Sequence, residues 1–411
     1  MSALASKDVL RPGATGAKAA LGAWAFSKYP LVFRALRRLW PIPHYKRTYA
    51  VTLYDDVREV YLSDDRFGVP YRDKLDVIMG GEPFFLGMDD PKAHDADVRA
   101  MRDVVLAPDI PNRLAPHVES AAEAIVATGN GKLEVVDQLV RRVTFDVYSD
   151  YLGVPTPDGY DLKVWATRLF EFQFADFGND PDLRKEVDEI APALRAHIDG
   201  EIAARKQSGR TVDDVLGRCL ALQPARPDEF SDVKIRTALM GFMVGGPPQP
   251  PMVVPQALEQ LLLRPTELER AQLAARANDH AALAGVVFEA MRFDPLAPAL
   301  PRVALGDQVI AKGTRRATDV PNGATVHVAF SSAMRDSRRV PAPETFDPAR
   351  PANAFIHFGL GRHMCFGARM NEALLPLMLK PLLRRKNLRH APGGRLVKRG
   401  AFSDRLNVLF D

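Results

Sequence analysis

Cys365 is the residue whose surroundings point most directly to chemistry. It lies in the segment Phe358-Gly359-Leu360-Gly361-Arg362-His363-Met364-Cys365-Phe366-Gly367. The glycines allow tight backbone turns, and an apolar stretch with helical spacing follows. Backbone N–H groups at the start of a helix favour negative charge and lower the pKa of a nearby thiol. The segment therefore predicts a cysteine that is used as a thiolate.

The spacing F-G-x-G-x-H-x-C-x-G is much more specific than an isolated cysteine, for which a buried structural role would be the simpler interpretation. It resembles the cysteine loop of the cytochrome P450 family. The resemblance implies that Cys365 is the axial ligand of the iron of haem b, iron protoporphyrin IX. It also implies that Phe358 shields the sulfur and that His363 reaches a haem propionate. Gly359 and Gly367 belong to the same predicted haem-binding loop.

Two further motifs agree with this resemblance in order and spacing. Glu289-Ala290-Met291-Arg292 matches the E-x-x-R motif of the family, and residues three apart share one face of a helix. The resemblance implies a buried ion network behind the haem, whereas the motif alone would fit a surface pair. Arg302 occupies the place of a propionate-binding basic residue. The segments Arg335-Asp336 and Phe346–Arg350 resemble the family's meander.

A second predicted haem contact comes from the segment Asp89–Val105, which resembles the helix that carries a propionate-binding histidine in the family. His94 matches that histidine. The usual arginine four residues later is replaced by Val98, and Arg99 follows one position later. One position is a rotation of about 100° on a helix. Arg99 is therefore a candidate haem contact, with Arg102 as the alternative.

The chain departs from the family where (A/G)-G-x-(D/E)-T is expected. It has Gly245-Gly246-Pro247-Pro248-Gln249-Pro250-Pro251 instead. Four prolines within five residues must break a helix, because proline lacks an N–H and its ring clashes with the preceding turn. The carbonyls freed there need other partners, either water or Gln249 itself. The alternative is an offset in the alignment, in which a nearby residue supplies the missing hydroxyl group. The candidate, Thr237, lies two helical turns earlier, which is too far.

This departure leaves the reaction open. Ordinary monooxygenation needs two protons delivered to O2, and neither Pro248 nor the amide of Gln249 is an acid at neutral pH. Gln249 can still donate a hydrogen bond or orient a water, so Gln249, Gly245 and Gly246 are the predicted catalytic residues. We expect a monooxygenase. The alternatives are a peroxide-driven peroxygenase, an isomerase or dehydratase that does not use O2, and a non-catalytic haem-binding sensor.

The predicted substrate is a small apolar organic molecule, because apolar residues are abundant where the family has its pocket. The candidate pocket residues are Phe84, Phe85, Leu86, Leu296 and Phe402. Four phenylalanines within Leu169–Gly178 face either the pocket or the core. Cys219 is expected to be a buried helix residue.

Composition limits the partners. The formal net charge of +4 over 411 residues is too small to predict nucleic acid binding. No apolar run approaches the roughly 20 residues of a transmembrane span, and no signal peptide is visible, so the expected location is cytoplasmic. Basic residues after the cysteine helix would steer an acidic ferredoxin or flavodoxin, or merely end the helix favourably. They are Lys380, Arg384, Arg385, Lys386, Arg389 and His390.

The element pattern predicts a mainly α protein with a minor β part, in one large domain of the P450 fold. Residues 91–217 have mostly helical spacing, residues 302–328 read as short hairpins, and a helix is expected over 368–385. The segment Thr48–Phe67 reads as a strand and then a helix capped by Asp55. Residues 1–45 are expected to form an extension that packs on a 46–411 domain. Its basic, partly amphipathic stretch Ala19–Trp40 could also touch a membrane surface.

Overall fold

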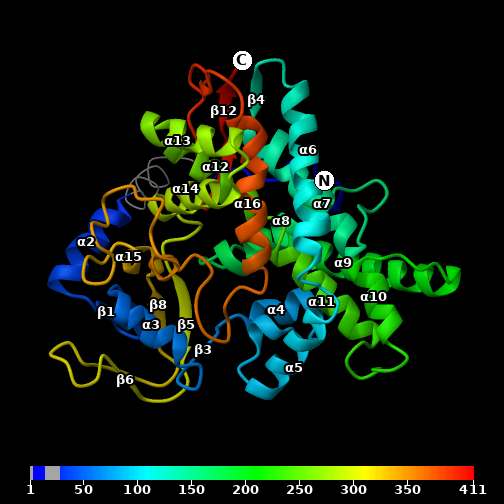
Figure 1. The fold of residues 1–411 in the computed structure, drawn as a ribbon. Helices are drawn as coiled ribbons and strands as arrows, with labels where there is room; N and C mark the ends of the chain where they lie inside the picture. Colours follow the sequence, from blue (N-terminus) through cyan, green and yellow to red (C-terminus); the bar gives the residue numbers. More distant parts are fainter. Residues whose placement is uncertain (1–2, 14–27) are drawn as a thin grey trace. The chain divides into compact units, whose positions relative to one another are not determined.

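The computed structural model describes residues 3–13 and 28–411 (Figure 1). Its tertiary contacts divide the chain into two compact units. The helical unit comprises Met1–Arg11, Tyr71–Pro255 and Met370–Asp411, and the mixed unit comprises Pro12–Pro70 and Gln256–Arg369. Within the described residues, no helix combines the length and the apolar character that crossing a membrane requires.

The helical unit is built mainly from α-helices and short helical turns. Its α-helices are α4 (Arg72–Met79), α5 (Pro91–Arg102), α6 (Ala115–Thr128), α7 (Arg142–Leu152), α8 (Leu162–Phe170), α9 (Pro181–Ser208), α10 (Val215–Leu222), α11 (Asp232–Gly245) and most of α16 (Ala368–Leu383). Shorter helical turns are η1 (Ala3–Ala5), η2 (Phe85–Gly87), η3 (Ile110–Leu114), η4 (Val135–Arg141) and η5 (Glu171–Ala175). Acidic caps start several of these helices; the Asp90 carboxylate accepts from Lys92 N at 2.8 Å, for example.

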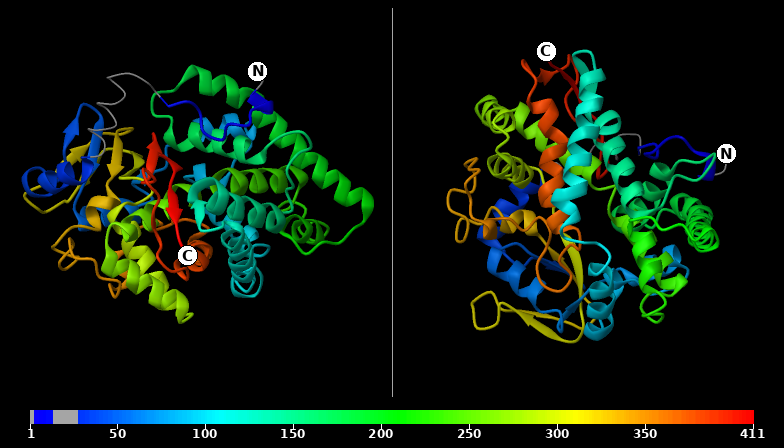
Figure 2. Two further views of the ribbon diagram at one scale, coloured as in Figure 1. Left: turned by 90° about the horizontal axis from the view of Figure 1, so that it is seen from above. Right: turned by 45° about the vertical axis from the view of Figure 1, so that its right-hand side comes forward.

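Short strands close the helical unit near the carboxyl terminus. Strand β12 (Asn407–Leu409) pairs antiparallel with both β4 (Lys132–Glu134) and β9 (Arg389–His390), and Figure 2 shows these last strands in red. Strands β10 (Val397–Arg399) and β11 (Phe402–Arg405) form a hairpin.

The mixed unit carries the larger sheet, in the order β1-β2-β8-β5-β3. Only the β2–β8 pair is parallel. Its strands are β1 (His44–Tyr45), β2 (Thr48–Val51), β3 (Phe67–Gly68), β5 (Leu300–Ala304) and β8 (Thr325–Val328), with a separate hairpin of β6 (Gln308–Ile310) and β7 (Thr318–Val320). Its helices are α2 (Tyr29–Leu39), α3 (Tyr54–Leu62), α13 (Pro265–Arg276), α14 (His280–Phe293), α15 (Phe330–Ala333), η6 (Ala352–Ala354) and most of α12 (Pro250–Leu262).

The mainly helical fold with small sheets agrees with the sequence prediction, including the strands over residues 302–328 and the helix from Ala368. The predicted cap of α3 is wrong. This helix begins at Tyr54, and Asp55 lies in its first turn beside Arg339, at 2.8 Å. The backbone N–H of Tyr54 instead donates to the Asp336 carboxylate at 3.0 Å, so a residue distant in sequence supplies the cap.

The predicted stretch Ala19–Trp40 is described only from residue 28, and α2 covers its second half. Residues 19–27 lie outside the described part of the chain. The boundary placed at residue 46 stays a prediction.

Candidate active site

The loop around Cys365 is held by its own backbone. Cys365 N donates to the carbonyl of Phe358 at 2.9 Å, and Ala368 N donates to the carbonyl of Cys365 at 3.1 Å where α16 begins. Cys365 is half-buried, just before the amino terminus of this helix. The helix start thus lies beside the thiol, as the sequence predicts, and favours a thiolate there.

Glycine is required within this loop for a steric reason. Gly359 and Gly361 have positive φ values of 71° and 76°, which other residues rarely adopt. A side chain at Gly361 would also collide with the carbonyl oxygen of Tyr61. The neighbouring Arg362 N donates to the Asp64 carboxylate at 3.2 Å, which ties the loop to the end of α3.

Helix α14 supports the other side of the loop through Phe288. The Phe288 carbonyl accepts a hydrogen bond from His357 Nε2 at 3.1 Å. The Phe288 ring lies 6.1 Å from that of Phe358 in an edge-to-face arrangement, and His357 also stacks on Phe355 with ring centroids 5.6 Å apart. Burial lowers the pKa of His357 to about 4, so this imidazole is neutral at pH 7.

The Glu289–Arg292 pair on the same helix is fully buried, as the family resemblance implies. Arg292 Nε and Nη2 donate to the Glu289 carboxylate at 2.8 and 2.7 Å, and both side chains are 0% exposed. Arg350 Nε adds a third charged hydrogen bond to Glu289, at 3.1 Å. One carboxylate therefore holds two guanidinium groups.

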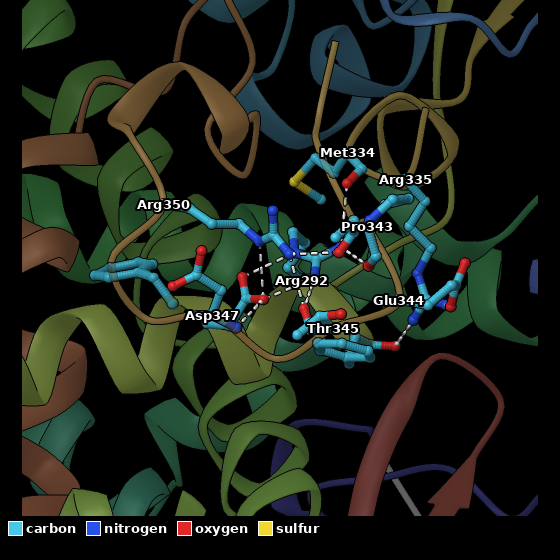
Figure 3. Close-up of polar contacts among 12 residues, drawn as sticks. Arg292, Met334, Arg335, Pro343, Glu344, Thr345, Asp347 and Arg350 are labelled. Atoms are coloured by element: carbon cyan, nitrogen blue, oxygen red, sulfur yellow. Dashed lines mark hydrogen bonds and ion pairs between the residues drawn. The ribbon is translucent and has the colours of Figure 1, made fainter. Parts of the chain in front are cut away.

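Backbone carbonyls of the meander satisfy the remaining donors, as Figure 3 shows around Arg292 and Arg350. Arg292 Nη1 donates to the carbonyls of Met334 and Pro343. Arg350 Nη2 donates to the carbonyl of Thr345 at 2.7 Å. Arg350 ends the Phe346–Arg350 segment that resembles the meander, but the sequence does not predict it as the third charged member of this network. Only the folded meander brings it to Glu289.

Arg302 is buried on β5 without an acidic neighbour. It is 3% exposed, its Nη1 donates to the carbonyl of Pro301 at 3.0 Å, and its guanidinium lies 5.0 Å from the centre of the Tyr61 ring. Within the described part of the chain, no carboxylate lies within 4 Å of it. The segments outside that part, residues 1–2 and 14–27, contain no Asp or Glu.

In the helical unit, α5 buries His94 but exposes Arg99. His94 Nδ1 lies 3.0 Å from the Asp95 carboxylate, and its ring meets that of Phe85 edge to face at 6.1 Å. Arg99 is exposed, and Glu229 feels its charge. Five positions place Arg99 about 140° from His94 around the helix. The structure therefore does not bring these two predicted haem contacts to one face of α5.

The predicted helix break is present between α11 and α12. Helix α11 ends at Gly245, and α12 starts at Pro250, where missing N–H groups cost little because the first turn of a helix leaves them unbonded. The Gln249 side chain donates to the carbonyl of Gly245. Gln249 itself is therefore a partner for a carbonyl that the prolines free. A side chain at Gly246 would come within 2.8 Å of Tyr148 in α7.

The candidate pocket residues lie in several places. Phe84 and Phe85 are buried with ring centroids 4.2 Å apart, and Phe84 packs so closely on α11 that a side chain at Gly241 would collide with it. Leu86 and Leu296 are half-buried in η2 and after α14. Phe402 is buried 6.1 Å from Phe170.

Among the phenylalanines of Leu169–Gly178, Phe170 and Phe172 are in the core and Phe177 is exposed. Cys219 is buried in α10, as expected, and burial raises its pKa to about 12.

The basic run after the cysteine helix is less exposed than the sequence suggests. Lys380 is buried, with its Nζ 2.7 Å from the carboxylate of Glu119 in α6, so its predicted place on a basic face is wrong. Arg384 also pairs with Glu119, and Arg385 pairs with Glu123. Helix α6 therefore neutralises much of this charge.

We predict that Glu289→Gln destabilises the protein by about 3–5 kcal/mol, because it leaves two buried guanidinium groups without a counter-charge. Urea unfolding measures this loss. Glu344→Gln removes the largely exposed partner of Arg335 and serves as the control, with an expected cost below about 1 kcal/mol. Equal costs for the two variants would contradict the central place of Glu289.

We also predict that acidification destabilises the protein through His357. Its pKa in the folded state lies below the usual 6.5, so between pH 6.5 and 4 only the unfolded state takes up this proton. Stability should fall by about 1–2 kcal/mol as the pH drops from 7 to 5. The same pH series on His357→Phe should show a shallower slope, and identical slopes would show that His357 does not titrate in this way.

Comparisons with known proteins agree with this arrangement. The family model described as cytochrome P450 matches residues 166–399. The cytochrome P450 monooxygenase PikC of Streptomyces venezuelae is 27% identical over 397 residues, 93% of this chain and 88% of the relative. The mycinamicin IV hydroxylase/epoxidase of Micromonospora griseorubida is 28% identical over 359 residues, covering 84% and 83%.

Two other matches support less: one covers only a short segment, and the other shows the fold alone. A bifunctional dioxygenase–epoxy alcohol synthase of Pyricularia oryzae is 38% identical over 92 residues, only 22% of this chain and 8% of that protein. The crystal structure of P450BioI with an acyl carrier protein ligated to hexadec-9Z-enoic acid superposes with a TM-score of 0.80 at 20% identity, covering 94% of this chain and 99% of that one. The fold, the buried Glu289–Arg292 pair and the matched family model together show that this chain belongs to the cytochrome P450 family.

Proposed function

We propose that this P450 inserts an oxygen atom into a small apolar organic substrate, at a haem b whose iron is ligated by Cys365. Family membership implies the haem cofactor and a monooxygenase-type oxidoreductase. The observation that carries the assignment of the ligand is the Cys365 loop, fastened to α14 and placed at the start of α16.

Arg302 provides a test of whether the residues fit a haem. Burial of a guanidinium without a counter-charge is costly, and Arg302 has no carboxylate neighbour within the described part of the chain. A haem propionate would supply that charge. His363 and His94 are the other proposed propionate contacts, and Arg99 is the weaker candidate because it is exposed. The residues therefore fit the group.

When bound, the haem supplies the redox centre, and the thiolate donates charge that favours O–O cleavage. The chain's own residues do the remaining work. Phe358 covers one side of the sulfur, and Gly359 and Gly367 shape the loop. The Glu289 network fixes α14, whose Phe288 holds the loop in place. Phe84, Phe85 and Leu86 are proposed to contact the substrate with Leu296 and Phe402.

The route of the protons is the unusual part of the proposal. The segment Gly245–Pro251 has no acid and no hydroxyl group, and the Thr237 hydroxyl donates to the carbonyl of Val233 within its own helix. Gln249 uses one amide N–H on the carbonyl of Gly245. Its second N–H and its carbonyl oxygen can orient a water, which is the role we propose for it.

These same observations favour a second candidate, a peroxygenase. With O2, the reaction R–H + O2 + 2e⁻ + 2H⁺ → R–OH + H2O requires proton delivery and an electron donor. With peroxide, R–H + H2O2 → R–OH + H2O needs neither. An acidic ferredoxin or flavodoxin stays the proposed donor for the first reaction.

Cys365→Ala tests the proposed ligand. We expect this variant to lose the thiolate-type Soret band of the ferrous–CO complex, because alanine removes the proposed sulfur ligand. Cys219→Ala is the matched control, since it removes the only other cysteine and should keep the band. A native band in Cys365→Ala would refute the assignment.

Gln249→Ala tests the proposed proton route. We expect turnover per haem to fall about tenfold or more, because the oriented water is lost, and stability to fall by only about 1 kcal/mol. Fatty acids, terpenoids and aromatics would be supplied with either H2O2 alone or a reductant, a surrogate ferredoxin and O2.

The control for this variant is Gln223→Ala, which removes another glutamine bonded to a backbone carbonyl, that of Phe230. Loss of haem with unchanged turnover per haem in Gln249→Ala would mean that Gln249 has a structural role only. Product from H2O2 alone, with little from the reductase system, would identify a peroxygenase.

A further inference from the structure

The amino-terminal part of the chain has an unusual charge distribution. Residues 9–54 contain no Asp or Glu but eight basic residues, which exceeds the net charge of +4 of the whole chain. They are Arg11, Lys18, Lys28, Arg34, Arg37, Arg38, Lys46 and Arg47. This positive charge is therefore concentrated in one segment, and the remainder of the chain is net negative.

Helix α2 lies in this segment and packs on α15 of the mixed unit (Figure 1). Arg37 is 6% exposed, and its Nη1 donates to the hydroxyl of Ser332 at 2.9 Å. Arg338 Nη2 donates to the carbonyl of Arg37 at 3.2 Å. Phe33 and Leu36 are half-buried on the same side. These contacts fix which face of α2 points outward.

The outward face carries an apolar stripe. Leu31, Val32 and Leu39 are 63%, 51% and 84% exposed. Together with the exposed Ala35, they share one side of the helix, because positions four and seven or eight apart are neighbours on its surface. Trp40, which directly follows the helix, is 49% exposed. We name Leu31, Val32, Ala35, Leu39 and Trp40 the α2 patch.

Basic residues border the α2 patch. Arg34 and Arg38 are exposed and lie one turn apart, on the flank of the stripe next to Leu31. Six residues after Trp40 along the chain, Lys46 is exposed, with its Nζ 5.4 Å from the centre of the Tyr45 ring. An apolar stripe with a basic border and an aromatic residue at one end is the pattern of a helix that lies in a membrane interface.

The basic border of the α2 patch favours a negatively charged binding partner, which distinguishes among the possible partners. A two-fold contact with a second copy of the chain would bring together two patches that are both bordered by arginines. Residues 14–27 carry Lys18 and no acidic residue, so they offer no negative partner either. Anionic lipid headgroups supply negative charge, and the acyl layer beneath them accepts leucine side chains.

We propose that the α2 patch docks the protein on the surface of an anionic lipid bilayer. The helix lies in the interface plane, with Leu31, Val32 and Leu39 below the headgroups and Arg34 and Arg38 among the phosphates. The contact is peripheral, since α2 has 11 residues and a span needs about 20. It does not depend on the proposed reaction.

The test uses the full-length haem-loaded protein and sedimentation with two kinds of vesicle, phosphatidylcholine alone and phosphatidylcholine mixed with phosphatidylglycerol. We expect binding to the mixed vesicles only, and weaker binding as NaCl is raised because salt screens the charges. The double variant Leu31→Ser/Leu39→Ser should bind the mixed vesicles at least about tenfold more weakly than the parent. The double variant Arg34→Gln/Arg38→Gln should lose a similar amount and most of the salt dependence.

A matched control is Phe177→Ser/Leu273→Ser, which removes two exposed apolar side chains elsewhere and should bind like the parent. The haem spectrum of each variant checks that it is folded. Absence of binding by the parent, equal binding to both vesicles, or unchanged binding by Leu31→Ser/Leu39→Ser would overturn the proposal. So would a dimer that forms without lipid and is lost in that double variant, since the patch would then belong to a second copy.

Discussion

The charged hydrogen bonds of the buried Glu289 carboxylate hold the mixed unit together around the cysteine loop. It accepts charged hydrogen bonds from Arg292 and Arg350, and those arginines in turn bind carbonyls of the meander. Removing charge from this centre would leave two guanidinium groups in a dry interior, which is far more costly than losing a surface pair. The same helix carries Phe288, which holds His357 and Phe358 in the cysteine loop. The Glu289 network therefore supports the cysteine loop indirectly, through the Phe288 contacts of the same helix.

Much of this could be predicted because chemistry constrains the residue types. Cys365, Glu289 and Arg292 follow from local spacing, and the helix break follows from the missing N–H groups of proline. Predictions failed where the partner is distant in sequence. Asp336 caps α3 in place of Asp55, and Glu119 draws Lys380 into the interior. No local pattern around Asp55 or Lys380 contains these partners, so only the fold shows them.

The arginines of α2 also show that the sequence alone does not predict which side chain is buried. Arg34, Arg37 and Arg38 are alike in sequence, yet only Arg37 is buried, because only its position on the helix faces Ser332. Helical periodicity predicts that Arg37 and Arg38 diverge by about 100°, but not which of them faces the protein. Once that face is known, the remaining residues define both an apolar stripe and its basic border, and the exposed leucines then require an explanation of their own.

The prolines after Gly245 connect the fold to the choice of oxidant. They end α11, which frees a carbonyl, and they also remove the acid and the hydroxyl that would organise protons. The Gln249 side chain donates to that freed carbonyl. Gln249 is also the only residue of Gly245–Pro251 with a polar side chain that could orient a water for proton delivery, and this hydrogen bond uses part of it. If Gly245–Pro251 forms the oxygen site as we propose, proton delivery is its weakest step, and an oxidant that brings its own protons removes that need. Hydrogen peroxide is such an oxidant, which makes the comparison between O2 and peroxide the decisive one for the chemistry of this enzyme.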